Sequence, residues 1–539
     1  MKTRTLLILA ATALFAVSCL DEEPKSQLSE KELFTDATAL YKHTVATLYN
    51  YIGGSSDSQG LQGTYRGVYD FNTFTTDEAM IPTRGGDWYD GGFWQDLYLH
   101  EWRAYDEALY ATWLYLYKVV GQCNFSLDKL DEYGKTLLTE SEREKCKAEV
   151  RAIRAMFYYY LMDMFGRIPL NLTSAFTQME QPERSVTYRF IVDELQQSAP
   201  LLSDKMSQHE GYYYGKFTQG AAYFLLAKLA LNAEVYADDD WTDGVSPNGK
   251  EILFKVDGQP LNAWETTLAY CRKLEALGYR LEPDYTTNFS ITNEVSEENI
   301  FTIPMDKTLY TSVFKNLFRS RHYSHGAALG TASENGSCAT LSTVRIYGYG
   351  TPEEDTRFAI NFYSGKVYVD GKMVTMQGGE PLVYEPLEVK LDLTGSPYEK
   401  TAGARMSKYE VDRSAYSDGH LQSNDIVLFR YADAVLMAAE AKVRNGEDGS
   451  AELNAVRRRV GMPERNATLA SILDERLLEL MWEGWRRQDL IRFGLFHQAY
   501  DQRPQLPRET NGYTTVFPIP SRAISLNGKL RQNPGYSAR

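Results

Sequence analysis

The chain has 539 residues, and its 57 Lys and Arg against 72 Asp and Glu give a formal net charge of −15. This length is sufficient for a large core or several domains. The negative charge argues against nucleic acid and anionic lipid as partners, because both bind clustered Lys and Arg. The 38 Tyr, 23 Phe and 8 Trp would fill a core, and so many Tyr also suit surfaces that contact a polar ligand.

Residues 1–18 have the pattern of a lipoprotein signal peptide. Two basic residues precede an apolar run of 12 residues, Leu6 to Val17, which is shorter than the roughly 20 needed to cross a bilayer. Small residues then lead directly to Cys19, which is predicted to become the lipidated N-terminus; ordinary cleavage beside an incidental cysteine is the alternative. Removing residues 1–18 takes away two basic residues and no acidic one, so the mature chain carries −17. Residues 19–30 are predicted to form a flexible acidic tether, and the protein to be anchored rather than membrane-spanning.

Residues 31–279 are predicted to be a helical region, because apolar residues recur there at three- and four-residue steps. The clearest helices are expected over 101–130 and 142–165, the second ending at Gly166 before Pro169. Further helices are expected near 31–50, 187–202, 217–237 and 263–277. Successive amphipathic helices favour a mostly α scaffold of tetratricopeptide-like helical hairpins, although no clean 34-residue repeat is visible.

Residues 280–428 are predicted to form a loop-rich, partly β region. Gly, Ser, Thr, Asn and Tyr become frequent, and the β-like run at 366–369 leads into Asp370-Gly371, a hairpin-turn dipeptide. Long irregular segments in compact proteins are often functional. Helices are expected again over 428–444, 449–460 and 469–492, in a C-terminal helical region covering 429–539.

Motifs along most of the mature chain resemble those of the SusD/RagB family. They are Arg151-Ala152-Ile153-Arg154-Ala155, Phe165-Gly166-Arg167-Ile168-Pro169-Leu170, Phe429-Arg430-Tyr431-Ala432-Asp433, Leu453-Asn454-Ala455-Val456-Arg457, the helix from Asp474 to Leu490, and the tail pieces Pro518-Ile519-Pro520 and Gln532-Asn533-Pro534-Gly535-Tyr536. Each is weak alone, but together and in this order they are specific. One departure is Trp485-Arg486-Arg487, where the family more often has a His-Arg or Tyr-Arg pair.

The resemblance implies a surface-exposed, lipid-anchored outer-membrane protein that binds oligosaccharide or polysaccharide. It further implies delivery of the glycan to a SusC-type TonB-dependent transporter, with no catalysis and no cofactor. The charged residues of the C-terminal motif, Glu475, Glu479, Glu483, Arg486 and Asp489, recur at helical spacing and are predicted to form structural ion pairs rather than a ligand site.

The first candidate ligand site is the loop from Thr76 to Trp94, where four Gly and a Pro favour ordered turns over a helix. Its aromatic and charged side chains suit a neutral glycan of the starch or fructan type, because sugar C–H faces stack on rings and hydroxyls need hydrogen-bond partners. The family resemblance agrees in kind. The predicted binding residues of this loop are Asp77, Arg84, Asp87, Trp88, Tyr89 and Trp94. A loop folded onto the helices is the alternative, because Trp is usually well buried.

The second candidate segment follows Ile303 and contributes Tyr310 and Tyr323 as predicted aromatic contacts. Nearby, His322 and His325 are three residues apart, but no third metal ligand is evident. A structural calcium, as in some relatives, is left open, with Asp284 or Asp425 as the acidic candidates. Four scattered cysteines beyond Cys19 show no metal spacing and are expected to be small buried side chains.

Two other functions, glycoside hydrolysis and protein binding, are alternatives to glycan binding. A glycoside hydrolase needs two carboxylates about 5–10 Å apart, and Asp87 and Asp90 of the aromatic loop are a conceivable acid/base pair, supported only by their proximity to Trp88. No HExxH, GxSxG, phosphate-loop or dinucleotide motif occurs in the sequence. A helical scaffold lipoprotein that holds proteins would share the same fold, so only ligand binding separates it from a glycan-binding protein.

Overall fold

The computed structural model describes residues 30–54, 60–175, 177–207, 209, 211–310, 314–414 and 422–537. The predicted signal peptide, Cys19 and all but the last residue of the predicted tether therefore lie outside the described residues. Within the described part, no helix combines the length and the apolar character that crossing a membrane requires.

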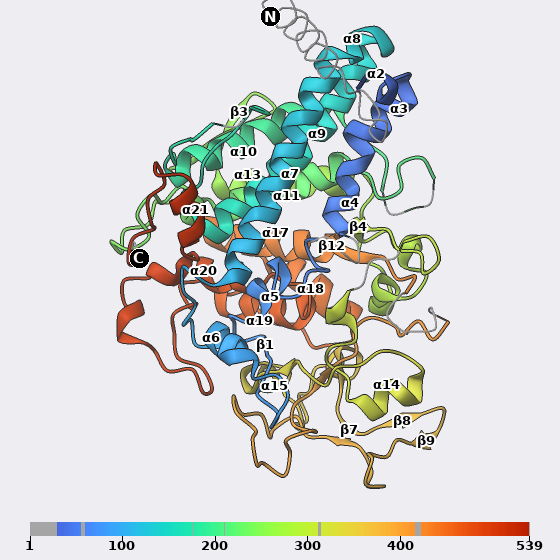
Figure 1. Cartoon of the computed structure of the whole chain (residues 1–539). Coiled ribbons are helices and arrows are strands. Elements are labelled where there is room, and N and C mark those ends of the chain that lie inside the picture. Colours follow the sequence, from blue (N-terminus) through green and yellow to red (C-terminus); the bar gives the residue numbers. More distant parts are fainter. Residues whose placement is uncertain are drawn as a thin grey trace, which may run out of the picture.

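The upper and central part of the molecule in Figure 1 is a stack of helices. Its long members are α7 (Glu107–Glu132), α9 (Glu140–Phe165), α10 (Arg184–Ser198), α11 (Gln219–Leu231), α13 (Ala263–Ala276), α17 (Tyr431–Asn445), α18 (Ser450–Arg459) and α19 (Leu469–Leu480). Helices close in sequence pack together, α7 on α9, α9 on α10 and α11 on α13. Across the intervening loop-rich region α13 packs on α17, and α17 packs on both α18 and α19. The mostly α hairpin scaffold expected from the sequence is confirmed.

Local signals explain where these helices begin and end. The Thr139 side chain accepts a hydrogen bond from the Glu142 amide while the Glu142 carboxylate accepts one from the Thr139 amide, a capping box that starts α9. From Ala152 to Phe165 every residue of α9 is buried. Because this half of α9 is covered on all sides, it forms the centre of the helical core.

Three expected helices are interrupted. The helix expected near 217–237 is divided at Asn232 into α11 and α12 (Ala233–Tyr236). The helix expected over 31–50 is divided into α2 (Glu30–Leu33), α3 (Ala37–Tyr41), a π-helical turn (Lys42–Ala46) and α4 (Thr47–Gly53). The helix expected over 469–492 ends at Leu480, and α20 (Arg486–Arg492) starts after a turn in which Trp482 and Gly484 have φ of +67° and +77°. Left-handed backbone cannot continue an α-helix, so the single-helix prediction is wrong here.

Shorter helices complete the helical part of the chain. They are α5 (Val68–Thr73), α6 (Phe93–Tyr98), α8 (Gly134–Leu137), α12 (Ala233–Tyr236), α14 (Tyr323–Leu329), α15 (Leu341–Ile346), α16 (Phe358–Asn361) and α21 (Ser521–Leu526).

The strands are short and pair two by two, all antiparallel. The pairs are β1 (Ala79–Met80) with β5 (Cys338–Ala339), β2 (Leu253–Val256) with β3 (Gln259–Asn262), β4 (Asn299–Ile303) with β12 (Ile426–Arg430), β6 (Phe362–Tyr363) with β11 (Arg405–Met406), β7 (Gly365–Lys366) with β10 (Val383–Tyr384), and β8 (Tyr368–Val369) with β9 (Lys372–Met373). Asp370 and Gly371 both have positive φ, so the predicted hairpin turn joins β8 to β9.

The region between β4 and β12 forms a loop-rich layer, seen in yellow and orange below the helices in Figure 1. Pairing of β4 with β12 brings the two ends of this layer together beside the helical stack. The partly β character expected for this region is confirmed, and its loops meet the predicted ligand loop.

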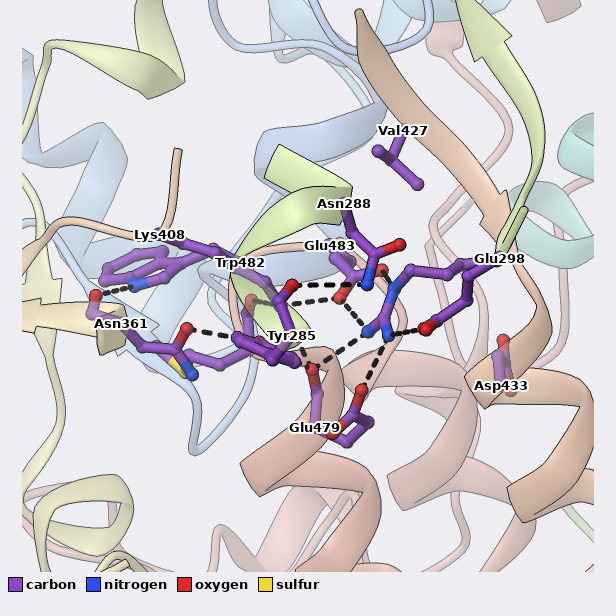
Figure 2. A network of polar contacts seen from close by, with 12 residues as sticks. Tyr285, Asn288, Glu298, Asn361, Lys408, Val427, Asp433, Glu479, Trp482 and Glu483 are labelled. Atoms are coloured by element: carbon purple, nitrogen blue, oxygen red, sulfur yellow. Dashed lines mark hydrogen bonds and ion pairs between the residues drawn. The ribbon is translucent and has the colours of Figure 1, made fainter. Parts of the chain in front are cut away.

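A buried charge network joins the two parts of the molecule (Figure 2). Arg430, at the end of β12, places its guanidinium 2.5 Å from Glu298, 2.6 Å from Glu479 and 2.6 Å from Glu483. Lys408 of the loop-rich layer lies 2.6 Å from Glu483 as well. Although burial opposes the charge, the three carboxylates raise the pKa of Arg430 well above its usual value. The C-terminal motif therefore stabilises the fold, as predicted.

The other charged residues of that motif pair both with distant partners and, in the case of Asp489 and Arg492, with a neighbour in the same helix. Glu475 pairs with Arg457 at 2.6 Å and with Arg357 at 2.7 Å. Asp489 lies 2.8 Å from both Arg476 and Arg492. Burial alone would raise the pKa of Asp489, but these two cations hold it below its usual value. These ion pairs tie α19 to α18, to Arg357 and to α20.

Candidate functional site

The predicted ligand loop begins in the interior of the protein. The Asp77 carboxylate is 9% exposed and accepts hydrogen bonds from Nε and Nη2 of Arg486, each at 2.7 Å. Arg486 belongs to the C-terminal motif, so Asp77 is the partner of a structural ion pair. This burial corrects the expectation that Asp77 faces a ligand.

Arg84 is fully buried and its donors are committed to backbone carbonyls. They contact the oxygens of Gly336 at 3.2 Å, Glu399 at 3.1 Å and Ala402 at 2.9 Å. Burial, together with the nearby Arg405 guanidinium, lowers the pKa of Arg84 to about 9. Arg84 thus joins three loop segments and does not face solvent, which corrects the prediction of direct ligand contact.

Trp94, at the start of α6, is also a core residue. It is 1% exposed, and its indole Nε1 donates to the Asp90 carboxylate at 2.8 Å. Its ring packs edge-on against Tyr65 and Phe74, with ring centroids 5.6 and 5.7 Å apart. In this conformation Trp94 cannot stack on a sugar, and it serves instead to support the loop above it.

Trp88 is held in a rare backbone conformation and remains partly exposed. Its φ is +65°, a region that bulky residues seldom adopt and that clusters at functional sites. The indole Nε1 donates to the Glu334 carbonyl at 2.9 Å, and the ring lies so close to Gly336 that a Cβ there would sit 2.6 Å from it. The loop therefore fixes the orientation of Trp88 through contacts with residues 334–336.

Around Trp88 the structure brings together polar and aromatic side chains from three segments. The Asp87 carboxylate lies 3.2 Å from the Lys400 ammonium and accepts a hydrogen bond from the Tyr323 hydroxyl at 3.4 Å. Tyr323 is 46% exposed and Tyr89 is 61% exposed. We call the group Asp87, Trp88, Tyr89, Tyr323 and Lys400 the Trp88 surface.

Two further ion pairs lie close to the Trp88 surface. Arg66 contacts the Asp90 carboxylate at 2.9 Å and lies 4.9 Å from the centroid of the Phe93 ring. Lys315 contacts Glu334 at 3.5 Å. Arg66, Lys315 and Lys400 were missed in the sequence because each comes from a segment outside the aromatic loop and matches no motif.

Tyr310 does not join this group. Its hydroxyl donates to the Gly54 carbonyl at 2.5 Å, and its ring packs beside Gly53, the last residue of α4. The structure therefore brings Tyr323 to the predicted loop and places Tyr310 at the end of α4.

The histidines, cysteines and acidic residues of the described part show no metal arrangement. Among the described residues, no three His, Cys, Asp or Glu lie close enough together to hold a metal ion. His325 is buried against the Tyr384 hydroxyl at 3.1 Å, and burial together with nearby arginines lowers the pKa of His325 to about 3. The four cysteines of the described part have free thiols, three of them buried.

Comparison with known proteins gives one consistent result. Residues 348–536 match the family model described as SusD family, and residues 20–231 match the model described as starch-binding associating with outer membrane. The starch-binding protein SusD of Bacteroides thetaiotaomicron is 24% identical, with 99% of this chain and 100% of that protein aligned. A SusD-like protein of Bacteroides ovatus is 23% identical over 90% of this chain and 82% of its own length.

Solved structures share the fold. Surface glycan-binding protein A from Bacteroides thetaiotaomicron, in complex with laminarihexaose, superposes with a TM-score of 0.69 at 20% identity, covering 93% of this chain and all of that one. A SusD-like protein from Bacteroides fragilis gives a TM-score of 0.70 at 19% identity, covering 94% and 99% of the two chains.

Proposed function

Because the chain belongs to the SusD/RagB family, we propose that it binds glycan, and that the Trp88 surface is where it does so. The observation that carries the assignment is the part-exposed Trp88, held at φ +65° between Asp87, which accepts a hydrogen bond from Tyr323, and the exposed Tyr89. Strained backbone persists only where the surroundings enforce it, and it clusters at binding and catalytic sites.

The chemistry of the surface suits a neutral oligosaccharide of the starch or fructan type. Aromatic faces stack on sugar C–H groups, while Asp87 and Lys400 supply an acceptor and a donor for hydroxyls. The nearby cations Arg66, Lys315 and Lys400 are each paired with a carboxylate, so the surface carries little excess charge. We expect affinities in the micromolar to millimolar range, about −4 to −8 kcal/mol.

The proposed cellular role is capture of glycan at the outer membrane. Lipidation at Cys19 would anchor the protein to the outer leaflet, and the bound glycan would pass to a SusC-type TonB-dependent transporter. The family description of association with the outer membrane supports this location. The net charge of −15 argues against nucleic acid as a further partner.

Binding without turnover is favoured over hydrolysis by the surroundings of the two candidate carboxylates. Asp87 is paired with Lys400, and Asp90 is paired with Arg66 and accepts from the Trp94 indole. Both candidate carboxylates are thus engaged by groups of this chain, whereas a hydrolase directs its two carboxyl groups at the bond to be cleaved. A purely protein-binding scaffold remains the competing function, and it predicts no glycan binding.

The test is calorimetric titration of the soluble chain lacking residues 1–19 with starch, levan, inulin, xylan, pectins and mucin glycans. We expect one saturable, glycan-specific signal that Trp88→Ala weakens at least tenfold, about 1.4 kcal/mol. Tyr368→Ala, which truncates a 56% exposed tyrosine of the β8–β9 hairpin, is the matched control and should bind as the wild type does. Absence of binding across the panel would favour the scaffold, and release of reducing sugar would favour a hydrolase.

A further inference from the structure

A second cluster of exposed aromatic side chains lies in the loop before α11, on the helical part of the molecule. Tyr212 is 75% exposed and Tyr213 is 37% exposed, with ring centroids 5.0 Å apart and ring planes nearly perpendicular. Large exposed aromatic groups side by side are uncommon unless they contact a ligand or partner. The Trp88 surface does not include them, and no motif in the sequence accounts for them.

A lysine orders the rings of this cluster. The Lys216 ammonium lies 3.6 Å from the centroid of the Tyr212 ring, 4.9 Å from that of Tyr41 in α3 and 5.9 Å from that of Tyr213. A cation over an aromatic face is attracted by the ring quadrupole. The Tyr41 hydroxyl is in turn hydrogen-bonded to the Glu149 carboxylate at 3.4 Å, which fixes the base of the cluster.

The loop that carries the cluster is anchored at several points. The Gly215 amide donates to the Ser207 carbonyl at 2.7 Å, and Gly215 has φ of +69° with no room for a Cβ against Pro304. Tyr214, between the exposed tyrosines and Gly215, donates its hydroxyl to the buried Asp425 carboxylate at 2.7 Å. The two exposed rings are therefore presented by a fixed backbone, which lowers the entropic cost of binding.

From this geometry we propose that Tyr212, Tyr213 and Lys216 form a second glycan-binding surface, separate from the Trp88 surface. The ring faces that Lys216 does not cover would stack on sugar C–H groups, and the phenol and ammonium groups would bond hydroxyls. The tyrosine hydroxyls and the lysine ammonium place polar atoms beside each ring. A sugar needs such atoms for its hydroxyl groups, whereas a hydrophobic protein partner does not. The inference rests on the proposed glycan-binding function, and it predicts that one polysaccharide chain can contact the protein at two places.

A polysaccharide chain that contacts both surfaces at once binds more tightly than a short one, without new interactions at either surface.

The experiment compares wild type, Tyr212→Ala/Tyr213→Ala, Trp88→Ala and the control Tyr368→Ala. Each is titrated with the polysaccharide that binds in the panel and with its six-unit oligosaccharide. For the wild type we expect two oligosaccharides bound per chain. The double tyrosine variant should bind one oligosaccharide with the remaining Kd within twofold of wild type, and should bind the polysaccharide at least tenfold more weakly.

Three results would overturn the inference. In the first, the double tyrosine variant keeps the stoichiometry and polysaccharide affinity of the wild type, while Trp88→Ala loses binding. This result would leave the Trp88 surface as the glycan site and refute the second surface. Unchanged glycan binding with reduced retention on phosphatidylethanolamine vesicles would assign the cluster to the membrane surface. If no glycan in the panel binds the wild type, both this inference and the proposed function fail. Thermal unfolding within about 2 °C of wild type verifies that the variants are folded.

Discussion

Replacing Asp425 by Asn should remove a large part of the pH dependence of stability. Asp425 precedes β12, is 1% exposed and accepts hydrogen bonds from the Tyr214 hydroxyl at 2.7 Å and from the Met305 amide at 2.8 Å. Burial raises its pKa from 3.8 to about 7, an effect that the bond from Tyr214 opposes. Because one pKa unit corresponds to about 1.4 kcal/mol, the difference between folded and unfolded chain is worth about 4 kcal/mol.

The sign follows from proton binding. Between pH 3.8 and about 7 the folded chain binds a proton at Asp425 more tightly than the unfolded chain does. The stabilisation that this proton gives is fully present below pH 3.8 and is lost as the pH rises through about 7. The asparagine of the variant keeps an oxygen acceptor and cannot ionise. Relative to the variant, the wild type should therefore lose about 3 kcal/mol of unfolding free energy between about pH 4.5 and pH 8.

Chemical denaturation of both proteins at half-unit pH steps measures this difference, and the other titrating groups cancel because both chains share them. Parallel stability curves for the wild type and Asp425→Asn would refute the reasoning. They would mean that the Asp425 carboxyl has the same proton affinity in the folded and unfolded chains.

Further predictions concern the charge network and the Trp88 surface. Arg430→Met should lower the unfolding free energy by about 3–5 kcal/mol, because it removes the cation that Glu298, Glu479 and Glu483 share and leaves the buried cluster with one more uncompensated negative charge; near-wild-type stability in denaturation would contradict this. Gly336→Ala should displace the Trp88 indole, with about 1–3 kcal/mol lost in stability and at least tenfold lost in glycan affinity by calorimetry; unchanged affinity would show that the ring position is unimportant. Lys400→Ala should weaken glycan binding several-fold while changing stability by less than about 1 kcal/mol, because its ion pair with Asp87 is exposed; a fall in melting temperature without a binding effect would assign Lys400 a structural role instead.

The helical scaffold could be predicted because its signals are local. In α9 the apolar spacing and the capping box at Thr139 and Glu142 both lie within the segment itself, and the observed start at Glu140 differs from the expected one by two residues. The break after α19 could not be predicted in the same way. It depends on Trp482 adopting positive φ while its amide donates to the buried Glu78 carboxylate, a contact between residues 404 positions apart.

The candidate site could be predicted only in part, because its geometry also depends on contacts between segments that are distant in the sequence. Composition pointed to the loop that contains Trp88 and Trp94, but it could not say which indole is exposed. That difference is set by Tyr65 and Phe74, which cover Trp94, and by residues 334–336, which hold Trp88 at the surface. Lys400 joins the site through the fold of the loop-rich layer, so no local pattern could have indicated it.

A crystal structure of the chain lacking residues 1–19, soaked with the oligosaccharide that gives the strongest calorimetric signal, tests the central claim most directly. The account predicts a sugar ring stacked on Trp88 with its hydroxyls within hydrogen-bonding distance of Asp87 or Lys400, close to Tyr89 and Tyr323. Sugar bound elsewhere, with the Trp88 surface empty at saturating ligand, would contradict it.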